Sequence, residues 1–213
     1  MTFLKYAISR INFQNYSPSR SSNLIFLSGI FETGMNNDRS PLIFITIDIE
    51  YRIDSGNTNI VFAVYEAYTK KAEWRSSSDA KRTSDEYGVW LANLMDREAL
   101  SSEDITDVII ASVVPETLFS LKSLCRKYYK CEPLIIGDKT VEIGIGVLAS
   151  DVGADRLVNA AAAHSSYTGP LIVIDFGTAT TFDVVDSEGN YYGGVIAPGI
   201  NLSLDALHMA AAN

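Results

Sequence analysis

The sequence has few of the residues that build metal centres, disulfide frameworks or membrane spans. Its 213 residues include two cysteines, Cys125 and Cys131, and two histidines. Two thiols with no neighbouring histidine make neither a zinc site nor a disulfide framework, so we expect reduced, structural thiols in a cytoplasmic protein. No apolar run approaches the roughly 18 residues that a transmembrane helix requires.

Positive charge is also scarce. Lysine and arginine number 17 against 26 acidic residues, which gives a formal net charge of -9. A nucleic-acid partner normally needs a basic face, and so does docking on anionic lipid, so we expect neither nucleic acid nor membrane as a partner. The 47% hydrophobic and 20% charged content is typical of a soluble globular protein.

The N-terminal region differs in composition from the rest. It holds no acidic residue before Glu32 but carries basic residues and many serines, as organelle transit peptides do. A disordered or wrongly assigned leader is the alternative, and we favour it. We therefore expect residues 1–50 to form an extension outside the fold, although the apolar run 42–49 could add a strand.

The remainder reads as an internal repeat. Each half is predicted to contain three strands followed by a helix, the first helix beginning at a capping box of Thr83 and Glu86. Strands are predicted at 53–57, 59–66, 71–76, 107–112, 134–136, 171–175, 180–185 and 191–196, with further helices from Pro115, over 151–164 and from Leu202. In both halves the first strand ends in Asp-x-Gly followed by threonine, as DSGNTN at 54–59 and DFGTATT at 175–181.

These two turns have the chemistry of a phosphate site. Glycine at a bend leaves backbone N–H groups unobstructed, and threonine hydroxyls add donors for phosphate oxygens. An aspartate at the strand end can hold a cation that offsets phosphate charge. Each turn alone could be an ordinary hairpin, but their matching positions in a repeat favour a nucleotide between two lobes. We expect Asp54 and Asp175 to lie close together at the mouth of one cleft.

The paired turns resemble those of the actin, hexokinase and Hsp70 superfamily of ATP-binding folds. Longer motifs narrow the resemblance to the type III pantothenate kinases, in that family's order, over about 53–213. These motifs are DSGNTNIVFAVYE at 54–66, KRTSDEYGVWL at 81–91, ASVVPET at 111–117, VGADR at 152–156, DFGTATTFDVV at 175–185 and GGVIAPGINLSLDAL at 193–207.

The resemblance implies a kinase that phosphorylates pantothenate with ATP to 4'-phosphopantothenate, the first step of coenzyme A biosynthesis. It implies a homodimer that needs a monovalent cation, K⁺ or NH₄⁺, and Mg²⁺. The implied fold is α/β, with duplicated actin-like (ribonuclease H-like) lobes of mixed sheets flanked by helices. We place the first lobe at 51–150 and an incomplete second lobe at 151–213.

Family motifs also imply the site residues. Asp155 matches the proton acceptor, and Asp175 matches the ligand of the monovalent cation. The ATP contacts are expected at Asp54, Ser55, Gly56, Asn57, Thr58, Asn59, Ile60, Val61 and Thr178. The pantothenate contacts are expected at Gly153, Ala154, Asp155 and Arg156.

Residue chemistry agrees with two of these roles. Asp155 falls in the first turns of its predicted helix, where the helix dipole and Arg156 should keep it ionised as a weak base. Arg156 could hold the pantothenate carboxylate as a bidentate pair. Spacing alone leaves open an Asp-Arg pair that merely solvates a helix start.

The sequence departs from the family pattern in three places. More than fifty residues precede the first motif, the segment 144–151 is about three residues short where the pantothenate pocket is bordered, and the chain stops soon after its last helix begins. A noncatalytic nucleotide-binding or regulatory protein, an inactive fragment, and a kinase for another small alcohol are therefore alternatives. We also expect the apolar faces of the second lobe, including Val184, Val195 and Ile196, to be uncovered.

Overall fold

The computed structural model describes residues 49–66, 69–139 and 141–211. The predicted N-terminal extension lies almost wholly outside the described residues. The strands are β1 (Ile49–Ser55), β2 (Asn59–Glu66), β3 (Thr69–Ser77), β4 (Ile105–Ser112), β5 (Leu134–Ile135), β6 (Gly146–Val147), β7 (Leu171–Phe176), β8 (Ala179–Val185) and β9 (Asn190–Pro198). The helices are α2 (Ser84–Arg97), α3 (Pro115–Leu124), the π-helical turn η2 (Cys125–Tyr129), α4 (Ala154–Ser166) and α5 (Ile200–Ala211).

The first sheet has the strand order β3-β2-β1-β4-β5. Strand β1 pairs antiparallel with β2 and parallel with β4, so the sheet is mixed. Strand β1 contains alternating apolar and polar residues, and short turns join the strands of the β1–β2–β3 meander. Helix α2 then begins at Thr83, where both hydrogen bonds of the predicted capping box form.

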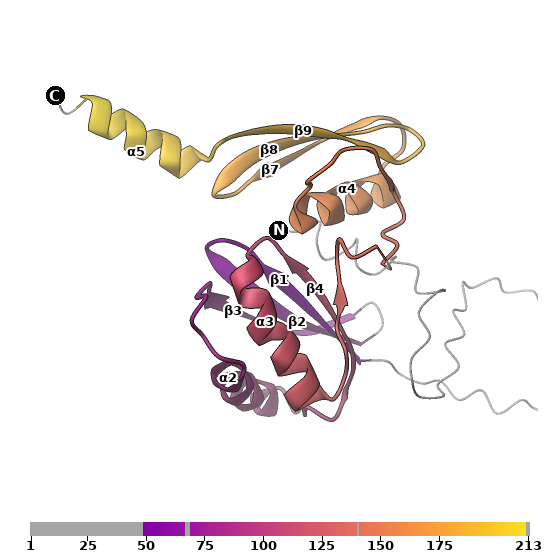
Figure 1. Ribbon diagram of the computed structural model, residues 1–213, viewed down its shortest axis with the longest axis vertical. Coiled ribbons are helices and arrows are strands. Elements are labelled where there is room, and N and C mark those ends of the chain that lie inside the picture. Colours follow the sequence, from indigo (N-terminus) through magenta and orange to yellow (C-terminus); the bar gives the residue numbers. More distant parts are fainter. Residues whose placement is uncertain (1–48, 67–68, 140, 212–213) are drawn as a thin grey trace, which may run out of the picture.

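Helices cover both faces of this sheet. Alternate residues of β4 face opposite sides, so Val108 and Ile110 pack with α2 and α3, whereas Ile109 and Ala111 pack with α4. Helix α4 therefore lies between the two sheets, as Figure 1 shows. The duplicated arrangement of mixed sheets and flanking helices is the actin-like fold that the repeat predicts.

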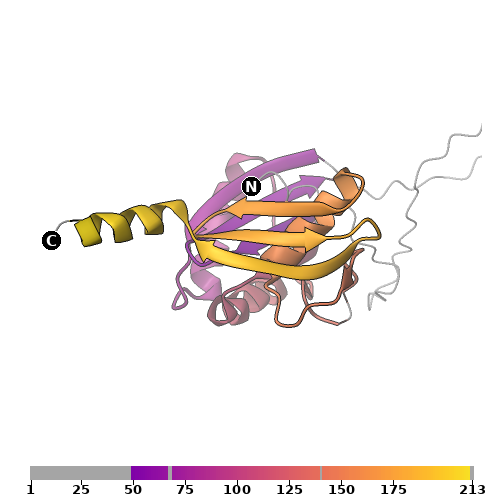
Figure 2. The same cartoon turned by 90° about the horizontal axis from the view of Figure 1, so that it is seen from above.

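The second sheet has the order β6-β9-β8-β7 and is covered on one face only by the described residues. Val173, Val185 and Tyr191 pack against α4 on the inner face. The outer face presents exposed apolar side chains, and Figure 2 shows no element lying over these strands. They include Ile172, Ile174, Phe176, Phe182, Val184 and Val195. The expected exposure of Val184, Val195 and Ile196 is confirmed.

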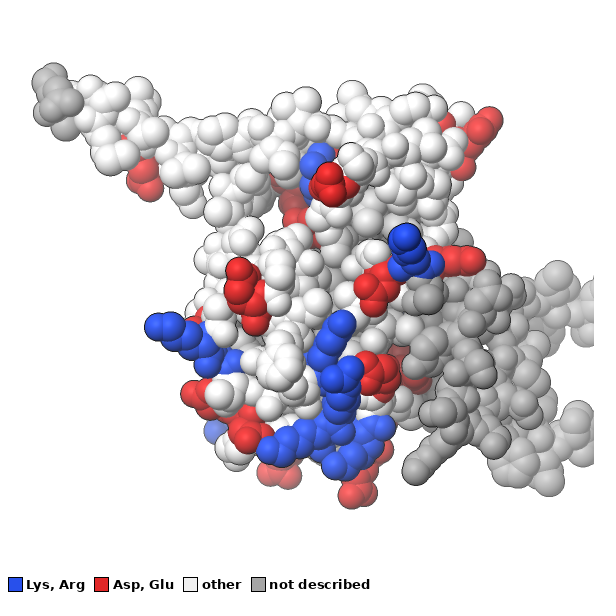
Figure 3. All heavy atoms as spheres, viewed as in Figure 1, with Lys and Arg blue, Asp and Glu red and all other residues white. Residues whose placement is uncertain are grey.

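Helix α5 leaves the end of β9 and points away from both lobes (Figure 1). None of its residues is buried, although it carries Ile200, Leu202, Leu204 and Leu207. Figure 3 shows this arm almost free of charged atoms, whereas lysines and arginines gather over the first lobe. Among the described residues, no helix is long and apolar enough to cross a membrane.

Local details differ from the sequence predictions. Strand β1 spans Ile49–Ser55 rather than 53–57, because Gly56 and Asn57 belong to the turn before β2. Helix α4 begins at Ala154 rather than Asp151, because Asp151 adopts a left-handed φ of 55° that a helix excludes. The helix from Pro115 ends in the π-helical turn η2, closed by Lys130 at φ 58°. Strand β6 was not predicted, because two residues beside glycine give no periodic signal.

Candidate active site

The two Asp-x-Gly turns meet across the boundary between the lobes. The Gly56 N–H donates to the Asn59 carbonyl at 3.0 Å, and the Gly177 N–H donates to the Ala179 carbonyl at 2.9 Å. The hydroxyls of Thr58 and Thr178 are hydrogen-bonded at 3.0 Å. The turns thus face each other as the repeat predicts, with threonine hydroxyls at their point of contact.

Carboxylates from three different elements converge beside these turns. Asp54 lies next to the last residue of β1, Asp155 lies in the first turn of α4, and Asp175 lies near the end of β7. Burial, followed by the negative charges of Asp155 and Asp175, raises the pKa of Asp54 to about 6. The expectation that Asp54 and Asp175 lie close together is therefore supported by their mutual repulsion.

Asp155 is held in place by the start of its helix. Its Oδ1 accepts a hydrogen bond from the Arg156 backbone N–H at 2.8 Å. An added Cβ on Gly153 would lie 2.6 Å from that same oxygen, so glycine leaves the space that the carboxylate occupies. Burial raises the pKa of Asp155, and the Arg156 N–H offsets only part of the rise. The carboxylate is thus more basic than the expected influence of the helix start and Arg156 suggested.

Arg156 already has a partner within the protein. Its Nε and Nη2 donate to Oδ1 of Asp183 at 2.9 Å and 2.5 Å. The side of the guanidinium formed by these nitrogens is therefore not open to a substrate. The bidentate contact expected of Arg156 would therefore use the other side, formed by Nη1 and the second hydrogen of Nη2.

Three further polar residues belong to this site but were not predicted from the sequence. The Asn159 amide donates to Oδ2 of Asp175 at 3.2 Å. Asp183 and Tyr191 complete the surroundings of Arg156. Asn159 lies four residues after Asp155, on the same helix face, and this spacing was a usable signal. Asp183 gave a weaker signal, because it is a carboxylate among apolar neighbours in β8.

The other predicted ATP contacts divide into accessible and buried groups. Asn57, Thr58, Asn59 and Thr178 are exposed, and Gly56 and Val61 are half-buried. Ser55 is buried and its hydroxyl bonds that of Thr117 at 2.8 Å, while Ile60 belongs to the first-lobe core. Only the backbone of these two residues could contact a nucleotide.

The predicted pantothenate contacts also divide into accessible and buried residues. Gly153 is the N-cap of α4 and is half-buried, whereas the Ala154 side chain packs in the core between α4 and β4. Among the described residues, no group of three or more His, Cys, Asp or Glu side chains has the geometry to hold a metal ion. Asp175, the residue expected to bind the monovalent cation, therefore belongs to no such group within the described part of the chain.

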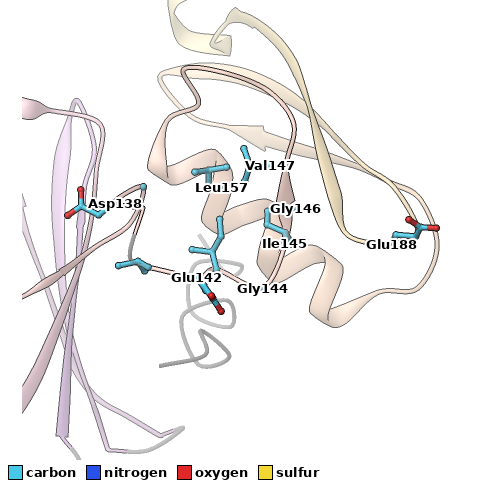
Figure 4. A pocket seen from close by; sticks show the side chains of 11 residues that line it. Asp138, Glu142, Gly144, Ile145, Gly146, Val147, Leu157 and Glu188 are labelled. Atoms are coloured by element: carbon cyan, nitrogen blue, oxygen red, sulfur yellow. The ribbon is translucent and has the colours of Figure 1, made fainter. Parts of the chain in front are cut away.

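A groove lies beside the segment that the sequence shows to be short. Gly144, Ile145, Gly146 and Val147 line it together with Leu157 of α4. Figure 4 shows Asp138 and Glu188 at its opposite ends, and Glu142 is a third acidic lining residue. None of the three site carboxylates lines this groove. Its acidic lining disfavours an anionic ligand there.

Comparison with known proteins identifies the chain's relatives. The family model described as type III pantothenate kinase matches residues 52–213. The chain belongs to the type III pantothenate kinase family. Type III pantothenate kinases of Paramagnetospirillum magneticum and Rhodospirillum rubrum are 66% and 63% identical to it over 163 residues. Each match covers 75% of this chain and 63% of the relative, so the chain spans about two-thirds or less of the relatives' length.

The solved structures that match the chain are more distant in sequence. The ethanolamine utilization protein EutJ from Carboxydothermus hydrogenoformans is 14% identical, with a TM-score of 0.42, over 78% of this chain and 58% of its own. The Aquifex aeolicus Ppx/GppA phosphatase is 13% identical, with a TM-score of 0.45, over 75% and 55%.

Proposed function

We propose that this protein transfers the γ-phosphoryl group of ATP to the primary hydroxyl of pantothenate. One observation carries the proposal: a partly buried carboxylate, Asp155, stands at a helix start beside two phosphate-type turns. Family membership supplies the substrates, which this geometry suits. Phosphoryl transfer needs mainly positioning and charge neutralisation, together with an acceptor for the proton of the attacking alcohol.

In this proposal the backbone N–H groups of the two turns bind the phosphates. Asn57, Thr58 and Thr178 offer accessible donors from opposite lobes. A triphosphate entering between the turns would replace the hydrogen bond between Thr58 and Thr178 with bonds to its own oxygens. The two lobes would then be joined through the nucleotide rather than directly.

Asp155 is assigned the role of proton acceptor. Burial raises its pKa, which makes it a stronger base than an exposed aspartate. The hydrogen bond from the Arg156 N–H fixes Oδ1 and leaves Oδ2 for the substrate hydroxyl. As the hydroxyl oxygen bonds to the γ-phosphorus of ATP, the bond from that phosphorus to the oxygen bridging it to the β-phosphate breaks, ADP leaves, and the hydroxyl proton passes to Asp155.

The negative charge of the three carboxylates favours a bound cation. Burial, followed by the negative charges of Asp155 and Asp175, raises the pKa of Asp54 to about 6, and a cation beside these carboxylates would offset their repulsion. Asp175, steadied by Asn159, would hold a monovalent cation, and Mg²⁺ would accompany the phosphates. Such cations supply positive charge that stabilises the transferring phosphoryl group. We further propose that the protein works as a homodimer in the cytoplasm.

Asp155→Asn tests the proposal, because it keeps the side chain's shape but removes its basicity. Loss of a general base typically lowers the rate about 10²–10⁴-fold. Turnover dependent on pantothenate should fall by that factor, while ATP affinity measured by calorimetry should hardly change. Asp96→Asn, on the exposed face of α2, is the matched control. Nearly full turnover in Asp155→Asn would remove the proton-acceptor role.

A noncatalytic nucleotide-binding role is the second candidate. The segment 144–151 favours it, because it is short where the pantothenate pocket is expected to be bordered. In that case ATP would bind to the unaltered chain, and no pantothenate-dependent transfer would follow under potassium or ammonium with Mg²⁺. The same assay therefore separates the two candidates.

A further inference from the structure

A buried carboxylate stands where β8 would otherwise present an apolar residue to α4. The Asp183 side chain is 2% exposed, on the inner face of the second sheet. Its neighbours on that face include the buried Val185. Burying a carboxylate is unfavourable unless it is paired and hydrogen-bonded, so this position needs an explanation beyond packing.

One oxygen of Asp183 gathers three donors. Its Oδ1 accepts from Nε of Arg156 at 2.9 Å, from Nη2 of Arg156 at 2.5 Å, and from the Tyr191 hydroxyl at 2.6 Å. Tyr191 itself is fully buried on the neighbouring strand β9. The donors come from α4 and β9. These hydrogen bonds therefore link helix α4, which carries Asp155, to the second sheet.

Gly194 on β9 leaves the space that the ion pair of Arg156 and Asp183 occupies. An added Cβ on Gly194 would lie 2.8 Å from both Nη2 of Arg156 and Oδ1 of Asp183. It would also lie 1.9 Å from the Phe182 carbonyl oxygen, which any larger residue must displace. Glycine at 194 thus permits the close approach of β9 to the ion pair.

The hydrogen bonds to Asp183 leave one end of the Arg156 guanidinium available. A guanidinium has five N–H donors in a planar fork, and Asp183 occupies only the side formed by Nε and Nη2. No described residue accepts a hydrogen bond from Nη1. The end formed by Nη1 and Nη2 has the geometry that a carboxylate accepts in a bidentate manner.

We propose that Asp183 and Tyr191 are positioning residues for the substrate carboxylate, acting through Arg156. This rests on the proposed function, in which Arg156 receives the carboxylate of pantothenate. Asp183 fixes one side of the guanidinium, so the end formed by Nη1 and Nη2 is already oriented toward the substrate carboxylate. The Arg156 side chain therefore loses little conformational entropy when the substrate binds. Tyr191 shares Oδ1 and holds the Asp183 carboxylate in that orientation.

The test compares two substrates that differ only in the group Arg156 would bind. Pantothenate is measured against its alcohol analogue, in which CH₂OH replaces the carboxylate, using calorimetry with ATP present and kcat/KM on the full chain. Asp183→Asn should lower the preference for pantothenate roughly tenfold or more, and Tyr191→Phe roughly two- to fivefold. Affinity for the alcohol analogue should stay nearly constant, which a general loss of structure would not produce.

Tyr129→Phe is the matched control for Tyr191→Phe. It also removes a buried tyrosine hydroxyl, but in the first-lobe core, where that hydroxyl contacts the Met95 sulfur. The preference should survive in this variant. If Asp183→Asn fails to fold by circular dichroism, Tyr191→Phe decides the question alone.

The outcomes separate this inference from the proposed function. If the unaltered chain neither binds nor phosphorylates either compound, the proposed function is wrong and this inference falls with it. If the unaltered chain prefers pantothenate and both variants keep that preference, only the role of Asp183 and Tyr191 is overturned. Arg156→Gln should abolish the preference, and its survival there would also overturn the inference.

Discussion

Helices α2 and α5 hold the same place in the two halves of the repeat but differ completely in burial. Each follows the third strand of a meander. Helix α2 buries Tyr87, Leu91 and Met95 against the first sheet, whereas none of the residues of α5 is buried. Yet α5 is the more apolar helix by sequence. The difference shows that a helix becomes part of a core only when a sheet face receives it, whatever its own pattern.

The same contrast divides the two sheets. The first has apolar cores on both faces, while the second has one face against α4 and one open to solvent in the described part of the chain. We therefore expect the stability of the chain to reside mainly in the first lobe. The carboxylates of the candidate site lie at the junction, where α4 is shared by both sheets.

The largest effect is expected from breaking the first-lobe core. Leu91→Ala removes a fully buried side chain from α2 and should lower the free energy of unfolding by about 2–5 kcal/mol. Leu204→Ala, its counterpart on α5, should change it by less than about 0.5 kcal/mol, because that side chain is 52% exposed. Urea unfolding of both variants measures the difference. A comparable loss from Leu204→Ala would mean that α5 is packed in solution.

The second prediction concerns Asp54 at the junction and depends on pH. Because its folded-state pKa is raised to about 6, the folded chain holds a proton that the unfolded chain has released between about pH 4 and 6. Stability therefore falls as pH rises through this range. Asp54→Asn removes the penalty and should raise the free energy of unfolding by up to about 3 kcal/mol at pH 7.5.

At pH 4 the same substitution should have little effect, because Asp54 is then protonated in the folded state. Urea unfolding at both pH values checks this, with the exposed Asp96→Asn as the control. Equal effects of Asp54→Asn at the two pH values would show that the pKa of Asp54 is not raised in the folded chain.

The contrast between lobes also explains what the sequence could predict. Alternation placed strand β2 at its observed bounds, and the Thr83 and Glu86 capping box placed the start of α2. These signals are local. The meeting of Asp54 with Asp175 was also predictable, because a repeat brings equivalent turns together.

Long-range polar pairing was not predictable in the same way. The partnership of Arg156 with Asp183 spans 27 residues and depends on how closely β9 approaches at Gly194. A single aspartate in β8 has the same local appearance whether it faces solvent or an arginine. The rise in the pKa of Asp155 was missed for a related reason, since burial comes from tertiary packing and the helix dipole is visible in sequence.

The smallest change in stability is expected on the outer face of the second sheet. Ile172 and Val195 are 68% and 66% exposed there, so replacing both with threonine removes little buried apolar surface. We expect the free energy of unfolding to change by less than about 0.5 kcal/mol. Threonine also suits a strand, which keeps the sheet intact.

Association of the chain should nevertheless change clearly. Contiguous exposed apolar patches favour self-association, and this double substitution interrupts the patch on two strands, β7 and β9. Light scattering at increasing protein concentration should show less association for the variant than for the unaltered chain, while a Leu204→Ala variant leaves the sheet patch in place. A loss of about 2 kcal/mol or more in stability would instead mean that the face is covered in solution. The contrast between the two lobes would then disappear, because both sheets would be buried on both sides.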